Sequence, residues 1–318
     1  MSDSNNNTYF FLTGLPGLEA VYTWLSIPLC VVYVASLAGN SLILWLVRSE
    51  PSLHQPMYYF LSMLAVTDLG LSASTLPTMI TIYMLGLRQV AVEVCLAQLF
   101  FIHSFSIMES SVLLTMAFDR FVAISSPLRY GTILTNTWIF SLGLAIVVRG
   151  IGLHIPVPIM LKKLPYCRNR LLSHSYCLHP DVMKLACSDT LINSAYGLFI
   201  VFSTLCLDSV LIVLSYGLIL QTVLSIVSKV ERLKALNTCV SHICAVLLFY
   251  IPTIGLSIIH RFEKRASPFS CVLLSYLHYV LPPLLNPIVY TIKTKQIRLK
   301  ILQLFRRGGI SKRDKEHH

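Results

Sequence analysis

The chain has 318 residues, of which 55% are hydrophobic and only 12% charged, and its mean hydropathy is +0.70. This composition excludes a soluble globular protein of this length and indicates an integral membrane protein. The net charge of +11 could suggest a nucleic-acid partner, but the basic residues are scattered among loops and concentrated in the C-terminal tail, which favours contact with anionic membrane lipids instead.

Apolar runs of about twenty residues or more recur along the chain, and a run of that length can cross a bilayer as a helix. The predicted fold is an all-α membrane protein, a seven-transmembrane helix bundle. The expected spans are residues 24–47, 57–85, 94–124, 137–161, 196–227, 238–259 and 269–292. They leave an N-terminal tail at 1–23, a membrane domain at 24–292 and a C-terminal segment at 293–318.

The charges at the two ends of the chain predict its orientation. Residues 1–22 contain no Lys or Arg, whereas the residues after Ile292 contain nine. The N-terminus is therefore expected outside and the C-terminus inside. The internal loops support this orientation less strongly, because the loop after the fourth span, which would lie outside, is itself basic. No cleavable signal peptide is expected, so the first span would act as a signal anchor. Asn6, in Asn6-Asn7-Thr8, is the predicted glycosylation site of a flexible polar tail.

Two carboxylates interrupt the apolar spans at mid-membrane depth. Asp68 lies in the second span and Glu109 in the third. Charged groups at this depth on neighbouring helices need a shared proton or a cation. The residues leave two readings open, protonated carboxyl groups in a polar core or a bound structural Na⁺, and no other cofactor is expected.

An acid and an arginine, Asp119 and Arg120, end the apolar run of the third span. They lie where hydrocarbon gives way to water, and an isolated arginine there would simply extend to the lipid head groups. Pro127 stops the helix shortly afterwards, which gives the pair a fixed relation to the membrane edge.

The surrounding stretch, MAFDRFVAISSPLRY at residues 116–130, resembles the MAYDRYVAICxPLxY signature of olfactory receptors, a branch of the rhodopsin-like G-protein-coupled receptors. The departures are Phe118, Phe121 and Ser125. The resemblance implies that Asp119 holds Arg120 at rest and that Arg120 contacts a heterotrimeric G protein when the helices part.

Four cysteines are expected on the outer side, at the start of the third span and in the loop after the fourth. In an oxidising compartment they imply two disulfides, for which three pairings are possible. The loop text SYCLHPDVMKLAC at residues 175–187 is similar to class I, or fish-like, olfactory receptors. That resemblance implies the pairs Cys95 with Cys177 and Cys167 with Cys187. Pro180 departs from the expected glutamine and would face the ligand.

Further motifs follow in the later spans. Arg149 in the fourth span and Asp208 in the fifth could form a salt bridge. Tyr216 stands in a Ser-Tyr pair that resembles the family's, whose tyrosine would help to hold Arg120 in the active state. KALNTCVSH at 234–242 resembles the olfactory KAxxTCxSH motif, and Pro252 could act as a hinge of the sixth helix.

The seventh span ends in PLLNPIVY at 283–290, similar to the family's PMLNPxIY, which implies switch roles for Asn286, Pro287 and Tyr290. Together with Asp68 and Glu109, Asn40 and Asn286 resemble the sodium pocket of rhodopsin-like receptors. The segment after the span is predicted to form a short amphipathic helix on the inner leaflet. Its apolar face would carry Ile297, Ile301, Leu304 and Phe305.

The expected function is that of an olfactory receptor in the plasma membrane. It would bind a small volatile or hydrophilic odorant, with a carboxylic acid as one candidate, and activate a stimulatory, olfactory-type G protein to raise cAMP. The candidate ligand-binding residues lie in the outer halves of the third and sixth spans: His103, Ser106, Ile107, Ser257 and Arg261. Arg261 would anchor an acid through two parallel donors, or else be a solvated loop charge.

Other classes of membrane protein fit the sequence less well. A transporter or channel is the alternative, but a transporter should show internal repeats, and none is found. An enzyme is not expected, because no HExxH, GxSxG or phosphate-binding loop occurs.

Overall fold

The computed structural model describes residues 9–14, 22–167, 170–262 and 268–303. Within these residues, seven helical segments are long and apolar enough to span a membrane, which confirms the predicted bundle. Their limits are Tyr22–Ser49, Pro56–Tyr83, Val92–Ser125, Asn136–Lys162, Leu191–Ser225, Lys229–Ile259 and Val272–Lys293.

Several spans consist of more than one helix, so the helices outnumber the spans. The long and short helices are α1 (Tyr22–Ser49), α2 (Pro56–Tyr83), α3 (Val92–Ser125), α4 (Tyr130–Ile133), α5 (Asn136–His154), α6 (Pro156–Lys162), α7 (His179–Lys184), α8 (Leu191–Val201), α9 (Leu207–Ser225), α10 (Lys229–Phe262), α11 (Pro268–Tyr279) and α12 (Leu281–Lys293). Short 3₁₀ turns occupy Pro51–Leu53 and Pro127–Arg129, and a π-helical turn at Phe202–Cys206 joins α8 to α9.

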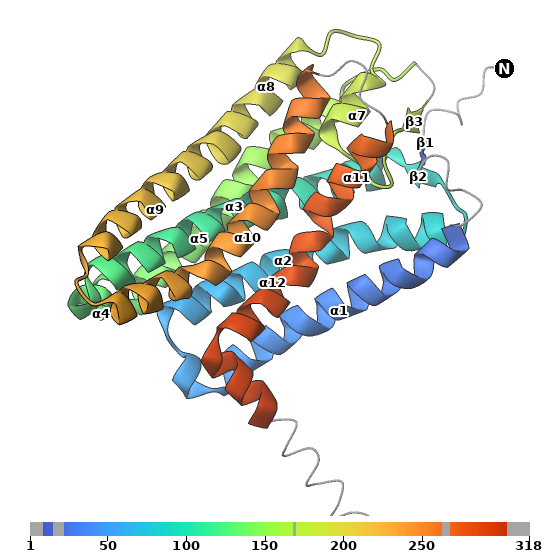
Figure 1. Ribbon diagram of the computed structural model, residues 1–318. Coiled ribbons are helices and arrows are strands. Elements are labelled where there is room, and N and C mark those ends of the chain that lie inside the picture. The colour runs from blue at the N-terminus through green and yellow to red at the C-terminus, as the bar shows by residue number, and fades with distance from the viewer. Residues whose placement is uncertain (1–8, 15–21, 168–169, 263–267, 304–318) are drawn as a thin grey trace, which may run out of the picture.

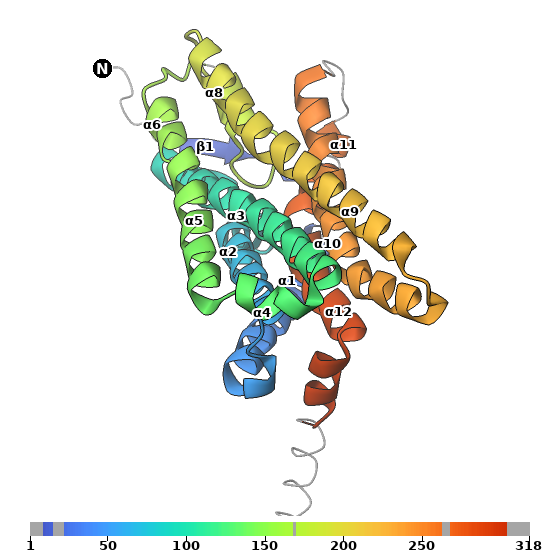
Figure 2. The ribbon, with the colours of Figure 1, turned by 90° about the vertical axis from the view of Figure 1, so that its left-hand side faces the viewer.

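Helix α3 lies at the centre of the bundle. It packs against α2, α5, α9 and α10, and Figures 1 and 2 show it crossing between them. The polar side chains of its middle section, among them Ser110 and Ser111, are buried against these neighbours rather than exposed to lipid. This position explains why α3 contributes both to the site near one end of the bundle and to the site near the other.

Proline and charge explain where the observed spans differ from the predicted ones. The seventh span is broken between α11 and α12, where Pro282 and Pro283 lack backbone donors. Helix α10 begins at Lys229, well before the predicted start of the sixth span at residue 238. Its first turns are charged, so hydropathy alone could not include them, although charged residues form helix readily outside the membrane.

A three-stranded sheet covers one end of the bundle, with strand order β2-β1-β3. The central strand β1 (Tyr9–Leu12) pairs antiparallel with β2 (Gln89–Ala91) and parallel with β3 (Leu171–Leu172). The prediction of a flexible polar tail is therefore wrong for β1, because Phe10 and Leu12 alternate with exposed residues and are buried. Asn6 lies outside the described residues.

The opposite end of the bundle carries α4 and a last helical segment at residues 295–303 (Figure 1). Ile297 is buried and Ile301 packs beside it, as predicted, whereas Leu304 and Phe305 lie outside the described residues. Lys300 donates from Nζ to Glu50 Oε2 (2.5 Å) and ties this helix to the turn after α1. We call this end the tail end and the other the sheet end.

Candidate ligand cavity and inner switch

A cavity of about 450 Å³ lies inside the bundle toward the sheet end. Helices α3, α5, α7, α8, α10 and α11 all contribute to its wall. Hydroxyl and imidazole groups line it together with apolar side chains: His103, Ser106, Ile107, Ser110, His154, Val157, Leu178, His179, Pro180, Met183, Ser194, Gly197, Ile200, Val201, Thr204, Leu205, Phe249, Thr253, Leu256, Ser257, His278 and Tyr279. Such a cavity, mostly apolar with a few polar groups, suits a small organic molecule.

Four of the five predicted ligand residues line this cavity, namely His103, Ser106, Ile107 and Ser257. The side chain of the fifth, Arg261, lies outside the described part of the structure. Sequence reasoning missed three histidines of the wall, His154, His179 and His278. They belong to α5, α7 and α11, and no motif or spacing indicates which way their side chains face.

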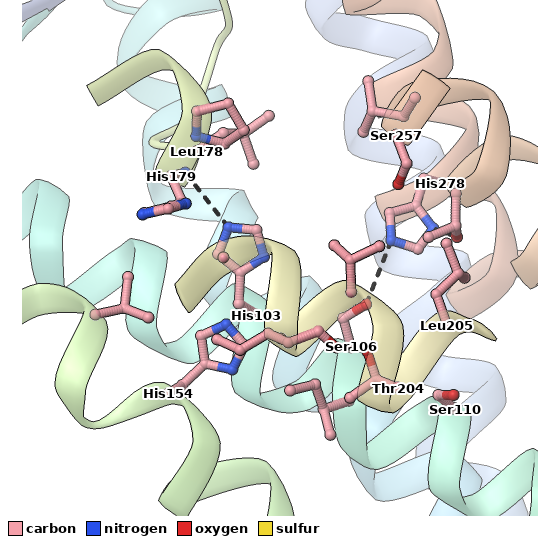
Figure 3. A pocket seen from close by; sticks show the side chains of 18 of the residues that line it. His103, Ser106, Ser110, His154, Leu178, His179, Thr204, Leu205, Ser257 and His278 are labelled. Atoms are coloured by element: carbon pink, nitrogen blue, oxygen red, sulfur yellow. Dashed lines mark hydrogen bonds between the residues drawn. The ribbon is translucent and has the colours of Figure 1, made fainter. Parts of the chain in front are cut away.

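The polar groups of the cavity form two clusters, which Figure 3 shows on opposite sides. In the first, Thr253 donates its hydroxyl to the Phe249 carbonyl (2.5 Å) and so accepts from Nδ1 of His278 (2.7 Å). Nε2 of His278 is then an acceptor for the Ser106 hydroxyl (3.3 Å). The cluster joins α3, α10 and α11 across the cavity floor.

The second cluster consists of His103, His154 and His179 (Figure 3). The rings of His103 and His154 stack with centroids 5.2 Å apart, and the backbone N–H of His179 donates to Nε2 of His103 (3.5 Å). Nδ1 of His154 is buried and has no hydrogen-bond partner among the described residues. A buried imidazole nitrogen without a partner is costly unless a ligand or water satisfies it.

Residues 178–184, which comprise Leu178 and α7, line the cavity at the sheet end, and we call this segment the lid. Disulfides flank it on both sides, Cys95–Cys177 and Cys167–Cys187, which is the pairing that the resemblance implies. Helix α8 approaches the lid closely at Gly197, where a β-carbon would lie 2.9 Å from Cε1 of His179. The cavity is thus bounded by a loop that is covalently tied to α3.

Arg149 and Asp208 form a salt bridge, as the sequence suggested they could. Arg149 donates from Nη1 to Oδ2 (2.8 Å) and from Nη2 to Oδ1 (2.9 Å) of Asp208. Ser110 also donates to Oδ2 (2.7 Å) and therefore accepts from the Tyr250 hydroxyl (2.9 Å). This network links α5, α9, α3 and α10 directly beneath the cavity.

The acid–arginine pair lies toward the tail end of α3 and is almost completely buried. Arg120 donates from Nε to Oδ2 of Asp119 (2.9 Å) and contacts the same oxygen through Nη2. Tyr130 donates its hydroxyl to Oδ1 of Asp119 (2.6 Å). Burial, and then the charge of Asp119, raises the pKa of Tyr130 above its ordinary value, so its hydroxyl stays protonated and can donate even in alkaline solution.

Tyr216 bonds to His242 in this structure. Nε2 of His242 donates to the Leu113 carbonyl (2.9 Å), so Nδ1 accepts from the Tyr216 hydroxyl (2.5 Å). A smaller cavity of about 230 Å³ opens beside them, lined by Arg120, His242, Tyr290 and several lysines. The predicted switch residues Asn286, Pro287 and Tyr290 are all buried on α12.

Comparison with known proteins identifies the family of this chain. The family described as "Olfactory receptor" matches residues 29–307. The chain belongs to the olfactory receptor family. Human olfactory receptor 51G2 is 57% identical over 304 residues, covering 96% of this chain and 97% of that protein, and human olfactory receptor 51L1 is 54% identical over 309 residues, covering 96% and 98%.

Squid rhodopsin shares the fold of this olfactory receptor, with a TM-score of 0.73 at 17% sequence identity, over 92% of this chain and 87% of that one. The chain is a multi-pass olfactory receptor of the class I branch with a rhodopsin-like fold, and its family consists of receptors rather than enzymes.

The Asp68 and Glu109 carboxyl groups of this olfactory receptor have oxygen atoms that could bind a cation. Asn286 donates from Nδ2 to both oxygens of Asp68 (3.2 Å each). Both Glu109 oxygens and Oδ1 of Asn286 are buried without a hydrogen-bond partner among the described residues. An oxygen donor set with a net negative charge suits a hard cation such as Na⁺, and it also suits protonated carboxyl groups.

Asn40 does not join these carboxyl groups. Its Nδ2 donates to the carbonyls of Ser36 (3.0 Å) and Pro283 (2.8 Å), so it ties α1 to the break between α11 and α12. Burying an amide in a helix bundle favours such a backbone partner, because every N–H within the membrane needs an acceptor.

Proposed function

We propose that this olfactory receptor binds a small polar odorant in the 450 Å³ cavity and, when occupied, activates a stimulatory, olfactory-type G protein that raises cAMP. The sheet end then faces outward and the tail end the cytoplasm of a cell whose plasma membrane holds the receptor. The observation that carries this proposal is the cavity beneath a disulfide-tied lid, with hydrogen-bonding groups on both sides of an apolar middle.

The wall of the cavity favours an odorant that carries oxygen. Hydroxyl and imidazole groups from α3, α5, α7, α10 and α11 point into it, and none of the described lining residues carries an obligatory charge. Each group can donate to a carbonyl or carboxylate oxygen or accept from a hydroxyl. Nδ1 of His154 has no hydrogen-bond partner among the described residues, and a plain hydrocarbon would leave it unsatisfied at a cost of about 1 to 3 kcal/mol.

A carboxylic acid would need a cation, and Arg261 is the candidate. It follows Ser257 by one helical turn on α10, so both residues lie on the same face of that helix. Arginine offers two parallel donors to a carboxylate. In the alternative, Arg261 is a solvated loop charge and the odorant is a neutral alcohol, aldehyde or ketone.

The tail end provides the surface for the G protein. Arg120 borders the 230 Å³ cavity but is held by Asp119, so contact with a partner requires the helices to move apart. Beside it, residues 295–303 carry Lys295, Arg298 and Lys300, which would attract the anionic inner leaflet.

A panel of short acids, alcohols, aldehydes and matching alkanes, tested in cells that report cAMP, examines this proposal. We expect responses to oxygen-bearing odorants of few carbons and none to alkanes. Replacing Arg261 with Ala should raise the half-maximal concentration (EC50) of acids about ten- to a hundredfold and leave neutral odorants unchanged, since a charge-assisted pair is worth about 1.5 to 3 kcal/mol. Unchanged acid potency in that variant would place Arg261 in the loop.

A further inference from the structure

The loop between α6 and α8 contains a buried pair of ionisable groups outside the cavity wall. Nδ1 of His174 is in hydrogen-bond contact with Oδ2 of Asp181, and both side chains are only 2% exposed. Burying a carboxylate is costly unless it is paired, and a pair that survives with so little exposure usually fixes a specific arrangement.

The pair joins a residue before the disulfide-bonded Cys177 to a residue after it. His174 precedes that cysteine, whereas Asp181 lies within α7 of the lid. Helix α7 has only six residues, and its N-cap residue Leu178 makes no side-chain capping bond. A helix this short does not hold its orientation by its own hydrogen bonds. A buried contact such as that from His174 can therefore hold α7 in one rotation about its axis.

That rotation decides which side chains of the lid reach the cavity. Leu178, His179 and Met183 line the cavity, whereas Asp181 and Val182 are buried away from it. Successive residues of a helix point about 100° apart. Even a modest rotation would withdraw His179 from His103, to which its backbone N–H donates, and would change the shape of the cavity.

We propose that His174 and Asp181 are positioning residues for odorant recognition, because their contact holds the lid in the rotation that presents His179 and Met183 to the cavity. This inference rests on the proposed function of that cavity. Asp181 has a second partner, Lys184, at 3.4 Å, but the Lys184 side chain is 59% exposed. An exposed lysine contributes little to holding a helix, whereas the contact with His174 is buried.

A first experiment examines the lid without any odorant. Val182 lies on the fully buried face of the lid, so Val182→Cys should react slowly with a membrane-impermeant maleimide on intact cells. Adding His174→Ala should raise the rate about tenfold, because breaking a buried pair increases the population of the displaced lid. Lys184→Cys, on the exposed side of α7, should react rapidly in both backgrounds, and the receptor without an added cysteine gives the blank.

A second experiment measures the effect on recognition, with the most potent odorant of the panel and cAMP as the readout. His174→Ala and Asp181→Ala should each raise the EC50 about tenfold at equal surface amount, and the double variant should be no worse than either alone. Lys184→Ala is the matched control and should leave the EC50 unchanged. The maximal response should persist in all of them, since the switch at Arg120 is intact.

A pair of amide variants separates positioning from a general loss of folding. His174→Asn keeps a donor where Nδ1 lies and should behave like the parent receptor, whereas His174→Gln places its amide farther out and should behave like His174→Ala. Equal behaviour of the two amides, or an unchanged maleimide rate in His174→Ala, would overturn the inference. A raised maleimide rate with no response to any odorant would support the lid and contradict the proposed function of the cavity.

Discussion

Individual buried polar residues of this olfactory receptor are held by specific partners. Arg149 and Asp208 show this most clearly, because two parallel hydrogen bonds join them and Ser110 takes up a further lone pair of the carboxylate. The Asp208 side chain is 2% exposed, so its charge depends on the arginine almost entirely. Removing one partner leaves the other uncompensated in a region without water.

We therefore predict that Arg149→Ala destabilises the receptor by about 3 to 5 kcal/mol and removes it from the cell surface. The double variant Arg149→Ala with Asp208→Ala leaves no unpaired charge and should recover part of the surface amount. Surface immunostaining of the three receptors measures this. A double variant that is less abundant than Arg149→Ala alone would show that the carboxylate does not depend on the arginine.

The carboxyl groups of Asp68 and Glu109 give a second prediction at this scale. If these carboxyl groups hold Na⁺, to which the unpartnered Glu109 oxygens could bind, replacing choline with sodium in the medium should weaken odorant potency in the parent receptor. Asp68→Asn removes one negative charge and should abolish this dependence. The measurement is the EC50 of each receptor in the two media. The same sodium effect in both receptors would contradict a bound Na⁺ and favour protonated carboxyl groups.

Among the elements, β1 has the least support from sequence. Its pairing to β2 and β3 buries Phe10 completely and leaves the adjacent Phe11 45% exposed. We predict that Phe10→Ala costs about 3 to 5 kcal/mol and lowers the thermal stability of the detergent-solubilised receptor, whereas Phe11→Ala costs little. Equal losses for the two phenylalanines would mean that the strand contributes nothing through its buried face.

The sequence predicts the elements that depend on hydrophobicity and misses those that depend on tertiary contacts. All seven spans follow from apolar length, since the bilayer imposes it. Strand β1 forms because partners from distant loops supply its hydrogen bonds. The π-helical turn Phe202–Cys206 is mostly apolar, like the helices on either side, so no sequence pattern indicates it. Helix α7 lies between two cysteines whose pairing the residues alone left open.

The sequence likewise predicts some residues of the candidate site and misses others. Motifs indicate Asp119 and Arg120, and the placing of His103, Ser106 and Ser257 in the outer halves of their spans indicates ligand contacts. His154 and His278 were not found, because a single histidine on an apolar helix gives no sign of which face it occupies. That information comes only from the packing of α5 and α11 around the cavity.

For the molecule as a whole, the two cavities lie at different depths along α3, which contributes residues to both. Between them lie the Asp68 and Glu109 carboxyl groups and the Arg149 network, and the network reaches α10 through Tyr250, close to Pro252. An odorant that repositions the wall of the first cavity can therefore bias α10, whose other end borders Arg120.

The most direct measurement is a cAMP dose–response, normalised to surface amount, for the parent receptor, Ser257→Phe and Arg120→Ala. Ser257→Phe fills the cavity and should raise the EC50 about tenfold or more while the maximal response remains. Arg120→Ala should abolish the response at an undiminished surface amount. An unchanged EC50 in Ser257→Phe, or a full cAMP response in Arg120→Ala, would contradict the account.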